Sequence, residues 1–245
     1  ATPQLPGEGR EYRDTDGSLW FVSSIVAKMG DTVLTDFASI TEEMLDQTIV
    51  CTPVYQKAAF VVTDGNGVTT YYPTEGTDAD NAMFTTRMNA LTAGDSLRLE
   101  TDVTVSAPVA LIEVRNVALD LNGHTLTYTG SAQLFPVRAC TFHLVSSRAG
   151  AKMVNTTKSA YLFNPYGSAT VYVGAGAAGS AYANFDGDNI SFYDFGFVTM
   201  QSNHLYVNGG YAYHSGATHL FQFPGGGAVH LTDLKIYLAE SYASV

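Results

Sequence analysis

The chain has 245 residues, of which 46% are hydrophobic and only 14% are charged, enough for one long domain or one domain with an appendage. Its formal net charge of −11 argues against binding to nucleic acids or to anionic membrane surfaces, because both need clustered lysine and arginine. Low charge combined with 23 glycines and 15 tyrosines favours a β-rich, surface-exposed protein over a helical cytosolic enzyme.

The N-terminal third predicts two parts. Residues 1–18 are rich in proline, glycine and charge and predict an extended arm that could lie across a neighbouring subunit. Residues 19–76 predict a small α+β attachment or capping domain, with a short helix at 40–46 that Thr41 would cap. Its strand candidates are residues 19–22, 32–34, 59–62 and 68–72, and the Asp-Gly and Asn-Gly pairs of 64–67 predict a hairpin turn between the last two.

Residues 77–91 predict an amphipathic helix that Thr77 and Asp78 open with an acidic N-cap and that Gly94 ends as a C-cap. Apolar side chains recur at helical spacing, and we expect them to face the core and not a cofactor. The positions are Met83 or Phe84, Arg87 or Met88, and Leu91.

From Leu97 onward the sequence predicts one β-coil after another. In residues 117–127 apolar residues alternate with small or polar ones, which indicates a strand with one buried face, and Asn122-Gly123 then turns the chain. Alone, this stretch would also fit a hairpin. Similar strands recur around Phe142, Val171, Phe192, Tyr206 and Val229, mostly at steps in the range of about 20–50 residues that is typical of solenoid repeats. The step to Tyr206 is shorter, so we interpret residues 205–207 as a second strand within one coil.

The phrase ALDLNGHTL, following GDSLRLETDVTVSAPV, resembles the opening coils of right-handed parallel β-helix proteins. That group includes pectate-lyase-like enzymes, phage tailspikes and bacterial surface proteins. The resemblance covers roughly residues 78–245 and implies an all-β fold: a helix-capped, right-handed parallel β-helix over residues 77–245, preceded by the small α+β domain. An architecture with so many known activities implies little about function.

Strand parity places a set of polar and aromatic residues on the outside of the coils. With Leu119 and its counterparts facing inward, the outward set is Asp120, His143, Tyr172, Tyr193 and His230, with Tyr206 beside them. Equivalent positions in stacked parallel strands lie about 4.8 Å apart, so these side chains should form a column. Such a column fits a subunit interface, a sugar-binding platform or an ordinary solvated face.

Few residues are candidates for catalysis or for metal binding. Asp186, Asp188 and Asp194 form the one acidic cluster within the coils and are candidate glycosidase carboxylates, although a turn or a hard-cation site such as Ca²⁺ would also use them. The scarcity of basic residues disfavours cleavage of anionic polysaccharides. The six histidines lack metal-ligand spacing, so we expect no metal and no cofactor. Cys51 and Cys140 lie in separate regions and predict no disulfide, with Cys140 a buried free thiol.

The order of arm, small domain, helix and solenoid is similar to that of phage tailspikes and tail fibres, which are typically homotrimers. The resemblance therefore implies a virion structural protein, at the virion surface or extracellular, that attaches through its N-terminal region. Its β-helix would serve host-glycan binding or subunit assembly, and the sequence leaves open whether the protein also has a catalytic activity. The alternatives are a secreted polysaccharide hydrolase or lyase on the same fold and a bacterial adhesin fragment. No cap is visible before Val245, so we expect further chain or oligomerisation to close that end.

Overall fold

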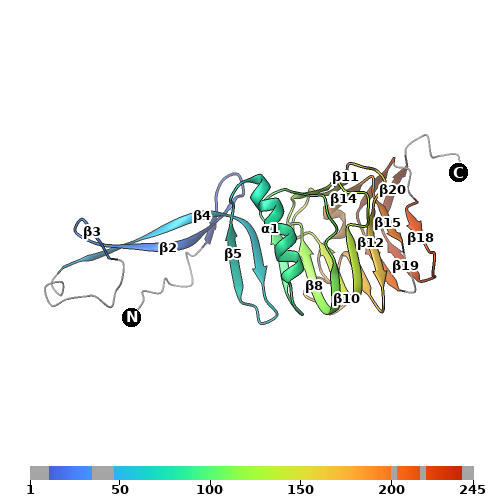
Figure 1. The fold of residues 1–245 in the computed structure, drawn as a ribbon, viewed down its shortest axis with the longest axis horizontal. Coiled ribbons are helices and arrows are strands. Elements are labelled where there is room, and N and C mark those ends of the chain that lie inside the picture. The colour runs from blue at the N-terminus through green and yellow to red at the C-terminus, as the bar shows by residue number, and fades with distance from the viewer. Residues whose placement is uncertain (1–10, 35–46, 200–202, 216–218, 239–245) are drawn as a thin grey trace. The chain divides into compact units, whose positions relative to one another are not determined.

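The computed structural model describes residues 11–34, 47–199, 203–215 and 219–238, which are mostly β-strand with a single α-helix in those ranges (Figure 1). The chain divides into two compact units between Ala58 and Ala59. This division falls before the predicted hairpin, which belongs to the second unit. The first ten residues of the predicted arm and the predicted helix at 40–46 lie outside the described residues.

The first unit is antiparallel β-structure. Its strands are β1 (Glu11–Arg13), β2 (Leu19–Met29), β3 (Thr32–Leu34) and the first part of β4 (Ile49–Thr63). β2 pairs with each of the others, so residues 11–18, which we predicted as part of an extended arm, instead form a strand and a turn. The indole Nε1 of Trp20 closes that turn by donating to Asp14 Oδ2 at 2.7 Å.

The second unit begins with the predicted hairpin. The last residues of β4 pair with β5 (Thr69–Pro73), and the turn between them is closed by hydrogen bonds from Asp64 N to Val68 O and from Gly67 N to Asp64 O. The same part of β4 pairs antiparallel with the first solenoid strand. The Asp-Gly-Asn-Gly turn is therefore confirmed.

Helix α1 (Thr77–Ala90) follows, and its buried residues confirm the predicted stripe. Phe84, Met88 and Leu91 all belong to the solenoid's hydrophobic core. The predicted caps are wrong. The N-cap is Gly76, whose φ of 101° suits glycine, and the C-cap is Leu91. None of the residues that the structure describes belongs to a helix with the length and apolar character needed to cross a bilayer.

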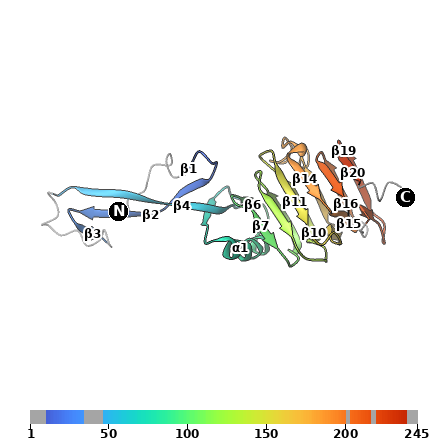
Figure 2. The ribbon, with the colours of Figure 1, turned by 90° about the horizontal axis from the view of Figure 1, so that it is seen from above.

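After α1 the chain winds into a parallel β-solenoid of about 5 turns, seen from above in Figure 2. Each coil supplies up to three strands, which pair in parallel with those of the next coil, so three faces run along the solenoid. The first face contains β6 (Ser96–Leu99), the second halves of β8 (Leu111–Asp120) and β10 (Phe135–Val145), β13 (Thr170–Gly174), β16 (His204–Asn208) and β19 (Ala228–Thr232).

The other two faces complete each coil. The second face contains β7 (Val103–Val105), β9 (Thr125–Tyr128), β11 (Ala151–Asn155), β14 (Ile190–Tyr193) with the 3₁₀ turn η3 (Gly187–Asn189) before it, β17 (Tyr211–His214) and β20 (Lys235–Leu238). The third face contains the first halves of β8 and β10, β12 (Tyr161–Tyr166), β15 (Gly196–Thr199) and β18 (Phe221–Gln222). β8 and β10 turn from the third face into the first near Glu113 (φ 72°) and Ala139 (φ 46°).

The register of the paired strands tests two interpretations that we drew from the sequence. Asn122-Gly123 is a turn between faces and not a hairpin, because β8 and β9 lie in different sheets. Phe192 is not equivalent to Val171: it lies on the second face, where it pairs with Met153 and Ala212. The second strand within that coil is therefore β14, and residues 205–207 belong to the next coil. Our assignment of residues 205–207 was wrong because the coils differ in length.

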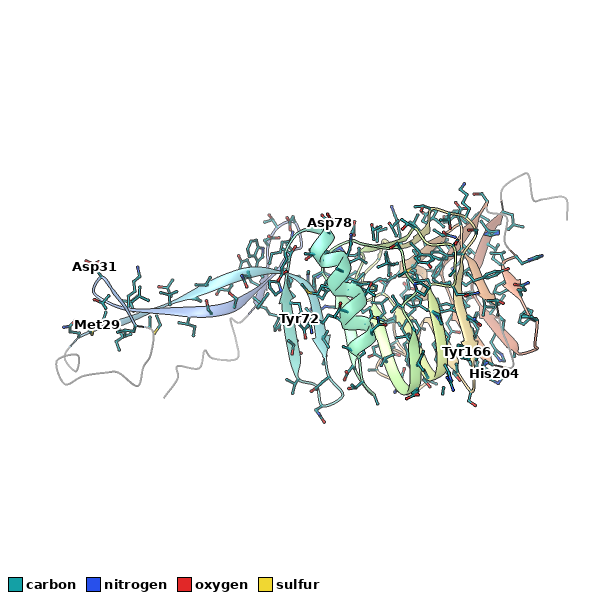
Figure 3. The ribbon with its side chains drawn as sticks, viewed as in Figure 1. Met29, Asp31, Tyr72, Asp78, Tyr166 and His204 are labelled. Atoms are coloured by element: carbon teal, nitrogen blue, oxygen red, sulfur yellow. The ribbon has the colours of Figure 1, made fainter. Side chains whose placement is uncertain are left out.

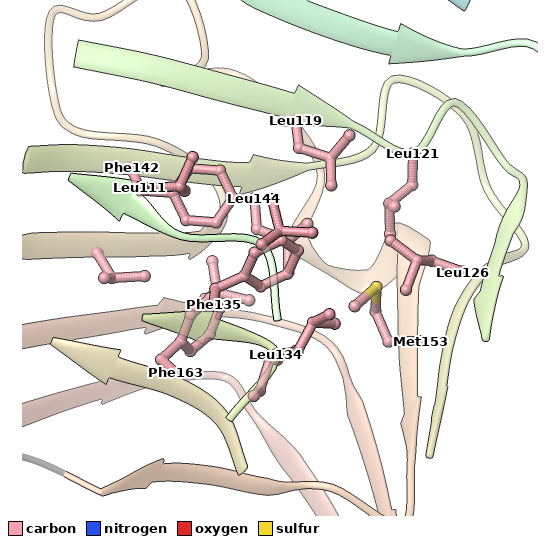
Figure 4. Packing of buried hydrophobic residues seen from close by; sticks show 14 of the residues in the cluster. Leu111, Leu119, Leu121, Leu126, Leu134, Phe135, Phe142, Leu144, Met153 and Phe163 are labelled. Atoms are coloured by element: carbon pink, nitrogen blue, oxygen red, sulfur yellow. The ribbon is translucent and has the colours of Figure 1, made fainter. Parts of the chain in front are cut away.

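The three faces enclose a continuous apolar core (Figure 4). The rings of Phe135, Phe142 and Phe163 lie 5.1–6.2 Å apart, centroid to centroid. Cys140 is buried in this core, as predicted, Cys51 is exposed, and the two form no disulfide.

Buried asparagines lie at turns between faces and tie neighbouring coils together. Asn122 Nδ2 donates to Leu99 O at 2.8 Å, and Asn122 Oδ1 accepts from Ser147 Oγ at 3.2 Å, so this one amide bridges three coils. Asn155 and Asn203 make comparable bonds at the two other kinds of turn. Each of these buried amides is thus satisfied by groups of its own coil or of adjacent coils.

Candidate functional site

An aromatic row runs along the first face, and it contains most of the outward residues that parity predicted. We call His143, Tyr172, Tyr206 and His230 the first aromatic row; they are direct register partners in β10, β13, β16 and β19. Their ring centroids are 5.0, 4.9 and 4.4 Å apart, and the ring planes differ by only 7–11°. His204, labelled in Figure 3, flanks the row at 5.8 Å from His230.

The loop between β13 and β14 covers the N-terminal end of this row. Tyr182 lies against His143, with ring centroids 5.0 Å apart and ring planes tilted by 40°. It also interacts with Ser96, whose register position lies two coils before His143, with the small Ala118 between them. His143 is consequently only 2% exposed, and its burial lowers its pKa to about 4. His143 therefore faces outward by parity but is covered by the loop.

Asp120 is likewise not a surface ligand. Its Oδ1 accepts hydrogen bonds from Asn122 N and from Ser147 N, both at 2.8 Å, and the residue is buried. Its carboxylate supports the turn at the end of β8. The structure therefore separates Asp120 from the first aromatic row.

Tyr193 belongs to a different row, on the second face. We call Tyr193, Tyr213 and Tyr237 the second aromatic row; they are register partners in β14, β17 and β20, with centroids 4.9 Å apart at both steps and ring planes within 11°. The single column that we predicted is therefore two. Tyr213 and Tyr237 escaped the sequence analysis, although they recur at one coil's spacing from Tyr193.

Stacking determines what the rows offer to a partner. Each ring covers the face of its neighbour, so the rows present ring edges, phenolic hydroxyls and imidazole nitrogens and not open ring faces. A sugar ring binds an aromatic side chain chiefly through that open face. The interior of either row is therefore no stacking platform for sugars.

A groove of about 330 Å³ lies beside the second aromatic row, with a polar corner at one side. Asp194 Oδ1 accepts from Ser215 N at 2.7 Å and from Ser215 Oγ at 2.5 Å. Lys158 Nζ donates to Ser215 Oγ at 3.1 Å and lies 3.6 Å from Asp194 Oδ2. Burial alone raises the pKa of Asp194, but the bonds from Ser215 and the Lys158 charge outweigh it and bring the pKa below its usual value.

A second groove, of about 320 Å³, contains the other two candidate carboxylates. Asp186 caps the 3₁₀ turn by accepting from Asp188 N at 3.0 Å. Asp188 pairs with Lys235 at 2.5–2.6 Å and accepts from Gly210 N, and these bonds hold its pKa below the usual value.

This geometry does not favour Asp188 and Asp194 as a glycosidase pair. Asp188 and Asp194 stand before and after β14, and at about 3.3 Å per residue their separation is roughly 15 Å or more, beyond the 5–9.5 Å that glycosidase pairs need. A general acid also needs a raised pKa, and both are lowered. Among the described residues no three metal-ligand side chains come together.

Comparison with known proteins gives no relative. No family model, curated protein or solved structure matches the chain. The fold and the two aromatic rows therefore rest on the chain's own geometry.

Proposed function

We propose that this chain is a non-catalytic structural protein of a virion surface, of the tailspike or tail-fibre kind, that assembles with copies of itself through the first aromatic row. The row is the observation that carries the proposal. Tyrosine is enriched at protein interfaces, and stacked rings lose little conformational freedom when they become buried. Tyr172 and Tyr206 are half-buried and His230 is exposed, so the row presents a rigid, flat edge along several coils.

The remaining parts of the proposal follow the resemblance. The coils wind right-handed, as parallel crossovers almost always do. α1 caps the first coil, consistent with its contribution of Phe84 and Met88 to the core. The N-terminal unit attaches the protein to the virion, the assembly is a homotrimer, and it acts outside the cell. A bacterial adhesin would use the same surfaces.

The primary test is the oligomeric state of the full chain, measured by size-exclusion chromatography with light scattering. We expect a trimer, and a shift toward monomer when Tyr172 and Tyr206 are both replaced by serine. Tyr213→Ser is the matched control, because Tyr213 sits in a similar stack on the second face. A monomeric wild type, or equal shifts in both variants, contradicts assembly through the first row.

Two further measurements separate the alternatives. Release of reducing sugars from a glycan panel, abolished by Asp188→Asn or Asp194→Asn, would establish the enzyme. Antibody labelling of purified virions by electron microscopy would support the virion protein, whereas labelling confined to bacterial envelopes would support the adhesin.

A further inference from the structure

We propose that the groove beside the second aromatic row binds a neutral saccharide. The inference rests on the proposed function, since a surface appendage needs a recognition site on a face that assembly leaves open. The groove is lined by the three stacked tyrosines and by Asp194, His214, Ser215 and Leu238. It lies on the second face, whereas the first aromatic row lies on the first.

The tyrosines supply a row of hydroxyls and an apolar wall. Burial and the neighbouring Tyr193 and Tyr237 raise the pKa of Tyr213, so its phenol stays protonated and both donates and accepts hydrogen bonds. The ring edges and Leu238 give the C–H groups of a sugar an apolar surface without requiring an open ring face. Tyr237, at the end of the row, is 50% exposed.

The polar corner supplies charged partners for hydroxyl groups. Asp194 is ionised: Ser215 engages its Oδ1, and its Oδ2 forms an ion pair of 3.6 Å with Lys158 Nζ. A carboxylate oxygen has two lone pairs, so Oδ2 keeps capacity to accept from a ligand in the groove. Lys158 does not line the groove and balances the charge of Asp194 from behind it. Hydrogen bonds of sugar hydroxyls to such ions are the stronger, charge-assisted kind.

The backbone at this corner supports a functional role. Asp194 and Lys158 both have left-handed conformations, with φ of 59° and 58°. Aspartate adopts this conformation readily, whereas it is costly for lysine, and costly backbone conformations cluster at ligand-binding sites.

Charge selects the class of saccharide. Lys158 and Asp194 cancel, so the corner is neutral as a whole. A uronic or sialic acid would meet the Asp194 carboxylate on a chain whose formal charge is −11, and a cationic ligand would meet Lys158. A neutral ligand rich in hydroxyls avoids both repulsions.

The test is binding of the full chain to an array of neutral and acidic oligosaccharides, followed by calorimetric titration of the neutral ligands that bind. Asp194→Asn should weaken binding about tenfold or more, the loss expected for a hydrogen bond to a charged group. Asparagine tolerates the left-handed backbone, so the corner should keep its shape. Tyr213→Phe should weaken binding and preserve the stack, whereas Tyr206→Phe, the matched change in the first row, should leave it unchanged.

Three results would overturn the proposal: no neutral oligosaccharide binds, only acidic ones bind, or Asp194→Asn and Tyr213→Phe both bind like the wild type. Light scattering on the same samples distinguishes failure of the saccharide proposal from failure of the assembly proposal. A trimer that binds no neutral glycan refutes the groove alone, and a monomer that binds one refutes assembly through the first row alone.

Discussion

Single buried side chains decide how the coils hold together, and Asn122 is the clearest case. Its amide satisfies groups in the coil before and the coil after its own. Replacing it with alanine leaves Leu99 O and Glu100 with fewer partners in a buried site. We expect Asn122→Ala to lower the free energy of unfolding by about 2–3 kcal/mol. Urea denaturation measures this, with exposed Asn66→Ala as a control that should change it by less than about 0.5 kcal/mol.

His143 makes stability depend on pH. Burial lowers its folded pKa to about 4 from a usual 6.5, so the unfolded chain takes up a proton first as pH falls. The contribution of neutral His143 is complete above pH 6.5 and is lost as pH drops through 4. His143→Phe keeps a ring in the stack but removes the group that titrates. The unfolding midpoint of this variant should therefore fall less than that of the wild type between neutral pH and pH 4. An equal fall of the midpoint in His143→Phe and in the wild type would contradict this prediction. The control is His219→Gln, at an exposed position, whose midpoint should fall with pH as in the wild type.

At this scale the sequence predicted side-chain direction but not solvent exposure. Alternation along residues 117–121 and around Phe142 correctly identified the inward residues, because strand geometry alone determines parity. It misjudged the accessibility of His143, because the covering Tyr182 comes from a loop far along the chain. Lys158 and Ser215 meet for the same reason: their proximity depends on coil lengths that no local pattern encodes.

Among the elements, α1 was predicted well because a helix needs only local periodicity. The prediction that follows concerns its packing. Phe84 is fully buried against Phe60, with ring centroids 6.2 Å apart. Phe84→Ala should cost about 3–5 kcal/mol through lost burial and the cavity left behind. Thermal unfolding followed by circular dichroism measures the loss, and exposed Thr86→Ala on the same helix should cost almost nothing. Equal effects would mean that the helix does not support the core.

The strands were harder to predict, because no single stretch of the sequence determines how many strands a coil contains. β8 and β10 each serve two faces, turning near Glu113 and Ala139 without a glycine or proline to mark the change. The sequence therefore predicted a solenoid but not three faces, and it merged Tyr193 into the wrong row.

For the whole molecule, the stacking of coils predicts a gradient of local stability. Inner coils have a neighbour on both sides, whereas β19 and β20 have one described neighbour each, and Leu231 and Leu238 are 48% and 51% exposed. In repeat architectures stability is approximately a sum of repeat and nearest-neighbour terms. Hydrogen exchange should therefore show strongest amide protection in β8 and β10 and weakest in β19 and β20. Uniform protection would mean that the solenoid opens as a single cooperative unit.

The chain's one tryptophan, Trp20, lies in the first compact unit, hydrogen bonded to Asp14. Indole fluorescence, excited where tyrosine does not absorb, therefore reports on that unit alone, while far-ultraviolet dichroism is dominated by the strands of the second. Recording both signals on one denaturant series would resolve whether the two units melt at separate midpoints, with no label and no substitution in the protein.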